Sequence, residues 1–222
     1  MKKIAVIYTS LGPLVNHFHK ILTEAVPGVE IIRVADDSLI RDVQKRGKPD
    51  ENIEKRTFLH IESVIEAGAE MVIIACSSVG ELAPKADARY DVPVIRIDDA
   101  MMNRAVHSGE KVGVVATLQT TIEPTVAFLL EKAKAAGKDV QVISRVAEGA
   151  YQALNAGDVE KHDALVTEAA KELEKETDVV ILAQGSMARL LEPLSRVLSV
   201  PVLTSPETCA DAVKEMVKQE EN

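Results

Sequence analysis

Cysteine is scarce in this chain, which has two residues of this type, Cys76 and Cys209. Two cysteines do not build a disulfide framework, and their spacing is not that of a CxxC metal pair. No apolar run approaches the roughly 20 residues that a membrane-spanning helix needs. The opening Met1–Lys3 leads directly into a candidate strand rather than into a signal peptide. We therefore expect a protein of the reducing cytoplasm without a membrane partner.

Basic residues are fewer than acidic residues in this chain. The 26 lysines and arginines face 35 aspartates and glutamates, which gives a net charge of −9. A charge of this sign argues against nucleic acid or an anionic membrane as the main partner. Neither GxGxxG nor GxxxxGK[ST] occurs, so the common phosphate-binding loops are absent from the sequence.

The remaining composition is that of an ordinary globular protein. Apolar residues make up 46% of the 222 positions and charged residues 27%, close to the averages for soluble domains. A chain of this length suits either two small domains or one larger domain, and it can bury a substantial core.

Short β-branched runs alternate with amphipathic segments along the chain. Apolar residues recur three and four positions apart in the segments between these runs, for example from Phe58 to Ile65 and from Leu165 to Leu173. Strands that alternate with helices predict right-handed crossovers, parallel sheets and an α/β fold. The predicted strands are Lys3–Tyr8, Glu30–Val34, Met71–Ala75, Val92–Ile97, Val112–Ala116, Val140–Ser144, Val179–Ala183 and Val200–Leu203.

The polar run from Ala35 to Pro49 interrupts this alternation. Its composition predicts either a surface loop or a short helix that covers a site.

The two halves of the chain resemble each other at a constant offset of 108 residues, without a gap. The offset relates Lys3 to Lys111 and Cys76 to Gln184. Several segments that share one offset indicate an internal duplication. We expect two α/β domains related by a pseudo-twofold axis, with residues 1–97 and 206–222 in the first and 98–205 in the second. Each would contain a four-stranded parallel sheet flanked by helices, with the site in the cleft between them.

Chemically useful side chains follow four of the predicted strands. Parallel sheets place their ligand sites at the carboxyl ends of the strands. These turns offer a thiol, an amide and several hydroxyls but no charged side chain, a lining that suits a small carboxylate rather than a metal ion. The candidate site residues are Thr9, Ser10, Cys76, Ser77, Ser78, Thr117, Thr120, Gln184, Gly185 and Ser186.

Each of these residues also has a purely structural interpretation. A free cysteine is often a small buried apolar residue, but Cys76 lies at a strand-to-helix turn, where a helix dipole would favour the thiolate. Ser78 and Glu81 form a candidate capping box, and Gln184 could bond to the backbone. Cys209 is most simply a core residue, and none of the five histidines has metal-ligand spacing with another.

Four motifs resemble those of the aspartate/glutamate/hydantoin racemase superfamily: Ser10–Leu14, Ala75–Ser78, Ala116–Thr120 and Ala183–Leu190. The resemblance covers nearly the whole chain and implies a cofactor-independent site between two like α/β domains. It implies that Cys76 is the first catalytic cysteine, whereas Gln184 stands where the second cysteine is expected. It also implies a small carboxylate as substrate and a homo-oligomer, expected to be a dimer.

Racemisation in this superfamily uses two thiols, one on each face of the substrate. The amide of Gln184 cannot exchange protons near neutral pH, so three outcomes are open. The protein is a racemase-type enzyme in which Ser186 or water acts as the second acid, a single-cysteine decarboxylase or cis–trans isomerase, or a binding protein for a small acid. We place proton transfer at the α-carbon of a small carboxylate first.

Overall fold

The computed structural model describes residues 1–12 and 14–220. The chain forms two compact units, one made of Met1–Asp99 with the segment from Cys209 onward, the other of Ala100–Thr208. Among the described residues no helix is both long and apolar enough to cross a membrane.

The first unit contains a parallel sheet with the strand order β2-β1-β3-β4. Its strands are β1 (Lys3–Tyr8), β2 (Glu30–Ala35), β3 (Met71–Ile74) and β4 (Val94–Arg96). Its helices are α1 (Leu14–Ala25), α2 (Asp37–Arg46), α3 (Glu51–Glu66), the 3-10 helix η1 (Ser77–Val79), α4 (Leu82–Asp87) and most of α10 (Ser205–Glu220).

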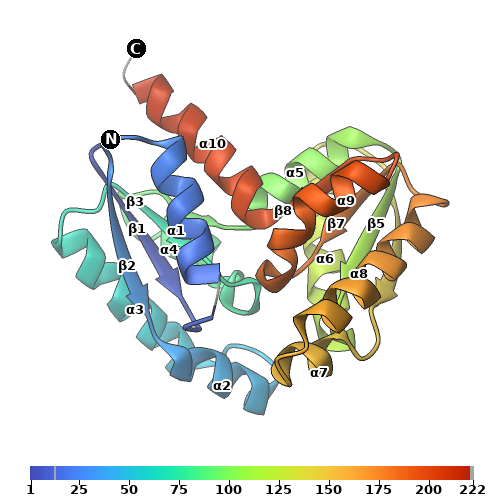
Figure 1. Cartoon of the computed structure of the whole chain (residues 1–222). Helices are drawn as coiled ribbons and strands as arrows, with labels where there is room; N and C mark the ends of the chain where they lie inside the picture. The colour runs from blue at the N-terminus through green and yellow to red at the C-terminus, as the bar shows by residue number, and fades with distance from the viewer. Residues whose placement is uncertain (13, 221–222) are drawn as a thin grey trace. The chain divides into compact units, whose positions relative to one another are not determined.

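Helices cover both faces of this sheet, because successive side chains of a strand point to opposite sides. Ile4 and Val6 of β1 pack with α1 and α10 on one face. Ala5 and Ile7 pack with α2, α3 and α4 on the other. Figure 1 shows α1 and α3 on the two sides of β1. This double cover explains why the strands are apolar throughout.

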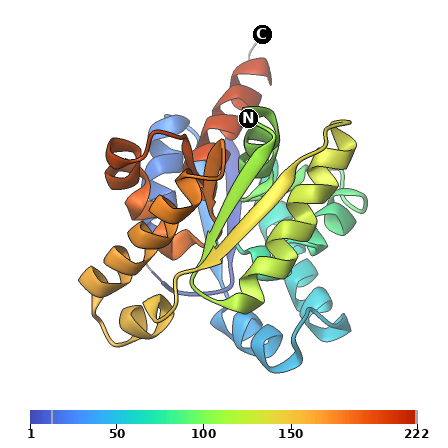
Figure 2. The same ribbon diagram turned by 90° about the vertical axis from the view of Figure 1, so that its right-hand side faces the viewer.

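The second unit contains a parallel sheet with the order β6-β5-β7-β8. Its strands are β5 (Lys111–Ala116), β6 (Gln141–Val146), β7 (Val179–Leu182) and β8 (Val202–Thr204). Its helices are α5 (Asp99–Ser108), α6 (Gln119–Ala135), α7 (Ala150–Asn155), α8 (Val159–Glu174), the 3-10 helix η2 (Gly185–Leu190) and α9 (Leu191–Val197). One face packs against α5 and α6, the other against α7, α8 and α9; Figure 2 shows β5 and β6 between α6 and α8.

The internal geometry of the two units repeats at the offset of 108 residues in most elements. Ile4 pairs with Met71, and Val112 pairs with Val179. Helices α3 and α8 correspond over their full lengths. The prediction of two four-stranded parallel α/β sheets flanked by helices is therefore confirmed.

The expectation of a gapless correspondence is wrong at one strand. Lys3 pairs with Glu30, but Lys111 pairs with Gln141, so β6 is displaced by three residues relative to β2. The reason is a longer helix before β6, because α6 has 17 residues and α1 has 12. A shorter helix afterwards, α7 with 6 residues against 10 in α2, helps to restore the offset.

The polar run after β2 is a helix rather than a loop. Asp36 caps the amino end of α2 by accepting a hydrogen bond from the Ser38 N–H. Gly47 ends the helix in the left-handed region, with φ of 82°. Leu39 and Val43 face the core, and α2 lies beside η1, the turn that follows Cys76.

Candidate active site

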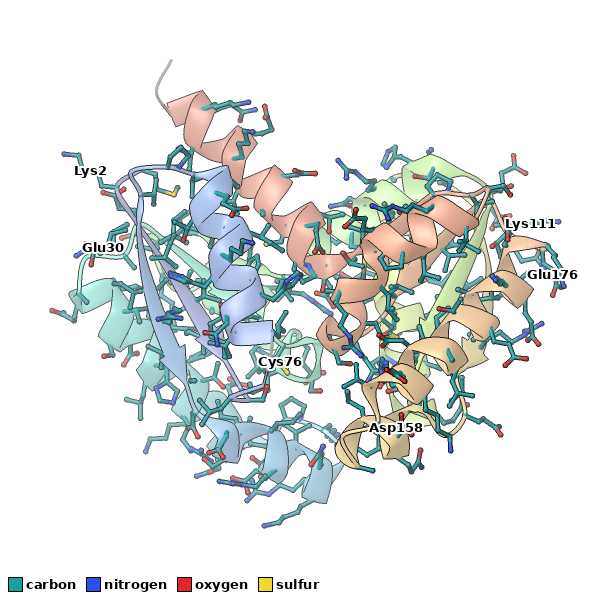
Figure 3. The ribbon with its side chains drawn as sticks, viewed as in Figure 1. Lys2, Glu30, Cys76, Lys111, Asp158 and Glu176 are labelled. Atoms are coloured by element: carbon teal, nitrogen blue, oxygen red, sulfur yellow. The ribbon has the colours of Figure 1, made fainter. Side chains whose placement is uncertain are left out.

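In the first unit the predicted site residues lie at the carboxyl ends of two adjacent strands. Thr9 and Ser10 directly follow β1, and Cys76 follows β3, with the strands in register where Ile7 pairs with Ile74. Thr9 is buried, Ser10 is exposed and Cys76 is half-buried. Figure 3 labels Cys76, whose sulfur lies at the start of the turn into η1. A thiol and hydroxyls therefore share one edge of this sheet.

The capping-box interpretation of Ser78 is wrong. Ser78 lies inside η1, which begins after Cys76, and α4 starts only at Leu82 with Glu81 as its N-cap and no side-chain capping bond. The turn is held instead by backbone hydrogen bonds: the Val79 N–H donates to the Cys76 carbonyl at 3.3 Å. Ser77 and Ser78 are thus half-buried and exposed, respectively, beside the thiol. The helical segments after Cys76 are three and six residues long. They are shorter than the helix whose dipole was expected to favour the Cys76 thiolate.

Charged side chains also reach this edge of the sheet, which the sequence analysis missed. Arg96, the last residue of β4, donates from Nε and Nη2 to the two carboxylate oxygens of Asp98, each at 2.8 Å. The side chains are 11% and 4% exposed. A buried bidentate pair of this kind is held firmly, because breaking it would leave a buried charge without its partner. An arginine inside an otherwise apolar run was the available signal.

A second charged cluster surrounds Asp36 at the end of β2. The carboxylate accepts hydrogen bonds from the Ser38 N–H and from Arg56 Nη2 at 3.0 and 2.8 Å, and His60 Nε2 lies 3.0 Å from Oδ2. Arg56 also donates to Asp42 of α2 at 2.8 Å. Burial alone would raise the pKa of Asp36, but the hydrogen bonds from Ser38, His60 and Arg56 outweigh it and hold the pKa well below its usual value. The cluster ties α2 to α3.

In the second unit the corresponding residues follow β5 and β7, which pair at Val115 and Leu182. Thr117 is buried directly after β5, and Thr120 is exposed in the first turn of α6. Gln184, Gly185 and Ser186 are half-buried at the start of η2.

Gln184 does bond to the backbone. Its side-chain oxygen Oε1 accepts from the Thr117 N–H at 2.6 Å and from the Thr117 hydroxyl at 2.9 Å. The backbone N–H can only donate, so Oε1 must face Thr117 and Nε2 is left as the donor. An amide nitrogen donates hydrogen bonds but does not take up or release protons near neutral pH.

Arg189 stabilises the turn that contains Gln184 by hydrogen bonds. It donates to the Ser186 carbonyl and to Asp163, both at 2.5 Å, and Nη2 lies 3.1 Å from Nδ1 of His162. His162 is fully buried. Among the described residues its Nε2 has no hydrogen-bond partner.

Cys209 differs sharply from Cys76. It is 1% exposed and belongs to the core between α10 and the first sheet, as the sequence predicts. Burial raises the pKa of its thiol, and the negative charges of Asp98 and Asp99 raise it further. Cys209 is therefore a core residue, and a buried thiol with a raised pKa is a poor nucleophile.

No group of three or more histidine, cysteine, aspartate or glutamate side chains within residues 1–12 and 14–220 has the arrangement of a metal site. The described site edges offer a thiol, hydroxyls, an amide, backbone N–H groups and the Arg96–Asp98 ion pair.

Comparison with known sequences gives one family and one curated relative. The family described as Asp/Glu/Hydantoin racemase matches residues 14–213. A glutamate racemase of Trichodesmium erythraeum (strain IMS101) is 30% identical over 80 residues. That match spans 36% of this chain and 30% of the relative.

Solved structures of the same fold cover almost the whole chain. A putative Asp/Glu racemase from Yersinia pestis has a TM-score of 0.77 at 20% identity, with 99% of this chain and 100% of that one covered. Allantoin racemase from Klebsiella pneumoniae has a TM-score of 0.75 at 21% identity and coverages of 99% and 89%. Glutamate racemase from Francisella tularensis subsp. tularensis SCHU S4, in complex with D-glutamate, has 0.71 at 17%, with 99% and 82% covered. At these identities the likeness concerns the fold.

Proposed function

The chain belongs to the Asp/Glu/hydantoin racemase family, and from this premise we propose that it transfers a proton at the α-carbon of a small carboxylate with Cys76 as the base. The observation that carries the proposal is the position of Cys76. The thiol is half-buried at the carboxyl end of a central strand, with the hydroxyls of Ser77 and Ser78 next to it in the chain. A carbon acid of this kind needs a positioned base and fixed donors for the negative charge that develops.

In the proposed step the Cys76 thiolate removes the α-proton, and the electron pair moves into the carboxylate to give an enediolate. The same thiol then returns a proton to the carbon. Hydroxyls of Thr9, Ser10, Ser77 and Ser78, together with the backbone N–H groups at the start of η1, are proposed to hold the carboxylate oxygens. The proposal calls for no group outside the protein and its substrate.

We further propose that Gln184 acts as a hydrogen-bond donor to a ligand oxygen. It occupies the position in the second unit that corresponds to Cys76 in the first. Because its Oε1 accepts two bonds from Thr117, its Nε2 is the group left to face a ligand oxygen. Thr120, Gly185 and Ser186 complete this half of the proposed binding set. The reaction would then proceed from one face of the carbon.

The same observation favours a second candidate, a single-cysteine decarboxylase or cis–trans isomerase acting on a small dicarboxylate. Both reactions need one thiol, and a fixed amide donor in place of the second thiol suits a second carboxylate oxygen. The names of the related structures, glutamate and allantoin racemases, supply the first substrates to examine.

The test is a screen of wild type for loss of the α-proton signal in deuterium oxide, followed by proton NMR. The panel comprises aspartate, glutamate, allantoin, alkylhydantoins, arylmalonates and maleate. Cys76→Ser should abolish exchange of any panel member that reacts, whereas Cys209→Ala, a matched control with the other cysteine removed, should retain it. If no member reacts but a small acid raises the melting temperature, the protein is a binding protein and the proposal is wrong.

A further inference from the structure

Gly80 follows η1 directly, and its backbone does not require a glycine. Its φ and ψ of −59° and −30° are right-handed helical values, which every residue adopts readily. Space is the constraint instead. A Cβ at this position would lie 2.7 Å from Nε and 2.8 Å from Cζ of Arg96, closer than nonbonded carbon and nitrogen atoms approach. The arginine side chain therefore lies directly against the backbone of Gly80.

Arg96 has little freedom to move away. Its guanidinium is fixed by two hydrogen bonds to Asp98, and both side chains are almost fully buried. A shift that broke these bonds would leave the Asp98 carboxylate buried without its partner. The backbone of Arg96 is in turn paired with Ile74 of β3, two residues before Cys76.

The second unit supports the same explanation, because it lacks both features together. At the offset of 108 residues Gly80 corresponds to Ala188, Arg96 to Thr204 and Asp98 to Pro206. The strand registers around these positions are the same in the two units. Where the arginine is absent, the corresponding position carries a side chain, that of Ala188, which lies inside η2.

We propose that Arg96 is a positioning residue for Cys76. The turn from Cys76 to Gly80 is tied internally, since the Val79 N–H donates to the Cys76 carbonyl and the Gly80 N–H donates to the Ser77 carbonyl at 3.1 Å. Contact between the guanidinium and Gly80 sets the position of this turn above β4, and through it the direction of the thiol. The role in catalysis rests on the proposed function, but the positioning itself does not.

The test is a cycle of variants read by alkylation of Cys76. The rate of reaction with iodoacetamide is measured against pH for wild type and for Gly80→Ala, each with and without the pair replacement Arg96→Met/Asp98→Asn. Peptide mass spectrometry reports Cys76 and Cys209 separately. Ala188→Gly, the corresponding change in the second unit, is the matched control.

Beside the native arginine, Gly80→Ala should slow alkylation of Cys76 by about fivefold or more and move its pH midpoint. In the background without the pair, the same change should alter the rate less than about twofold. Ala188→Gly should leave the rate of Cys76 unchanged. Simple loosening of the fold would instead raise labelling of Cys76 and Cys209 together.

An equal effect of Gly80→Ala in both backgrounds, or no effect beside Arg96, would overturn the proposal. If Gly80→Ala alone does not fold, the combined variant without the pair should fold, and failure of that variant too would overturn it. Alkylation needs no substrate, so the two proposals can fail separately. If the effect of Gly80→Ala depends on Arg96 but no panel member is turned over, the proposed function is rejected and the positioning role of Arg96 is retained.

Discussion

Replacing Gln184 by methionine should cost stability rather than merely change the ligand site. Methionine has nearly the same length but provides no strong acceptor, so the Thr117 N–H and hydroxyl both lose their partner. Thr117 is only 4% exposed, and water cannot readily replace the amide oxygen. A buried donor left unsatisfied costs about 1–3 kcal/mol. We expect Gln184→Met to lower the free energy of unfolding by that amount.

Urea unfolding followed by far-UV circular dichroism measures the loss, and a double-mutant cycle assigns it. Thr117→Val removes the hydroxyl and should cost about 1 kcal/mol alone. The double variant Thr117→Val/Gln184→Met should lose about 1 kcal/mol less than the sum of the two single losses, because the Thr117 hydroxyl is no longer there to be left without an acceptor. Gln184→Glu should retain most of the stability when ionised, since a carboxylate accepts both bonds. Gln152→Met, an exposed glutamine on α7, should change little and is the control.

A loss below about 0.3 kcal/mol for Gln184→Met, within the usual range of surface substitutions, would refute this reasoning. Strict additivity of Thr117→Val and Gln184→Met would refute the assignment of the loss to their shared hydrogen bonds.

The remaining predictions concern the two cysteines and Asp36. Native protein should incorporate iodoacetamide at Cys76, whereas Cys209, buried and with a raised pKa, should react only after unfolding in urea; equal labelling in both states would contradict this. Because the pKa of Asp36 is lowered on folding, its contribution to stability is fully present above the unfolded value of about 3.9 and is lost as the pH falls towards the folded value. Asp36→Asn should therefore reduce the free energy of unfolding at pH 7 and make its decline below about pH 4 less steep. If urea unfolding gave the same decline below about pH 4 for Asp36→Asn and wild type, the hydrogen bonds of Asp36 would not stabilise the fold.

Much of the fold follows from hydrophobic periodicity alone. Strand β1 occupies Lys3–Tyr8 in both the prediction and the structure, because an apolar run bounded by polar residues leaves little freedom. Strand β4 is shorter than predicted and starts after Pro93, which has no N–H to give to the ladder. The displacement of β6 could not be seen from the offset, since it arises from the length of α6 and not from the strand itself.

The site was less accessible to sequence reasoning. Thiol and hydroxyl positions at strand ends follow from topology, because parallel strands end at one edge. Arg96 and Asp98 are only two residues apart, so this pair left a signal in the sequence that was overlooked. The Asp36 cluster joins residues 20 and 24 positions apart, on different elements, and spacing along the chain does not encode this. The capping box at Ser78 failed because a 3-10 turn intervenes before α4.

In the proposed mechanism Cys76 exchanges an α-proton from one face of its substrate, because the Gln184 amide is not a proton donor near neutral pH. The most direct measurement follows deuterium incorporation and optical rotation together, in deuterium oxide, for each enantiomer of a panel member that reacts. Wild type is expected to label one enantiomer while the rotation stays nearly constant, and Gln184→Cys is expected to raise the rate of racemisation. Equal exchange of both enantiomers with loss of rotation in wild type would contradict the proposed mechanism.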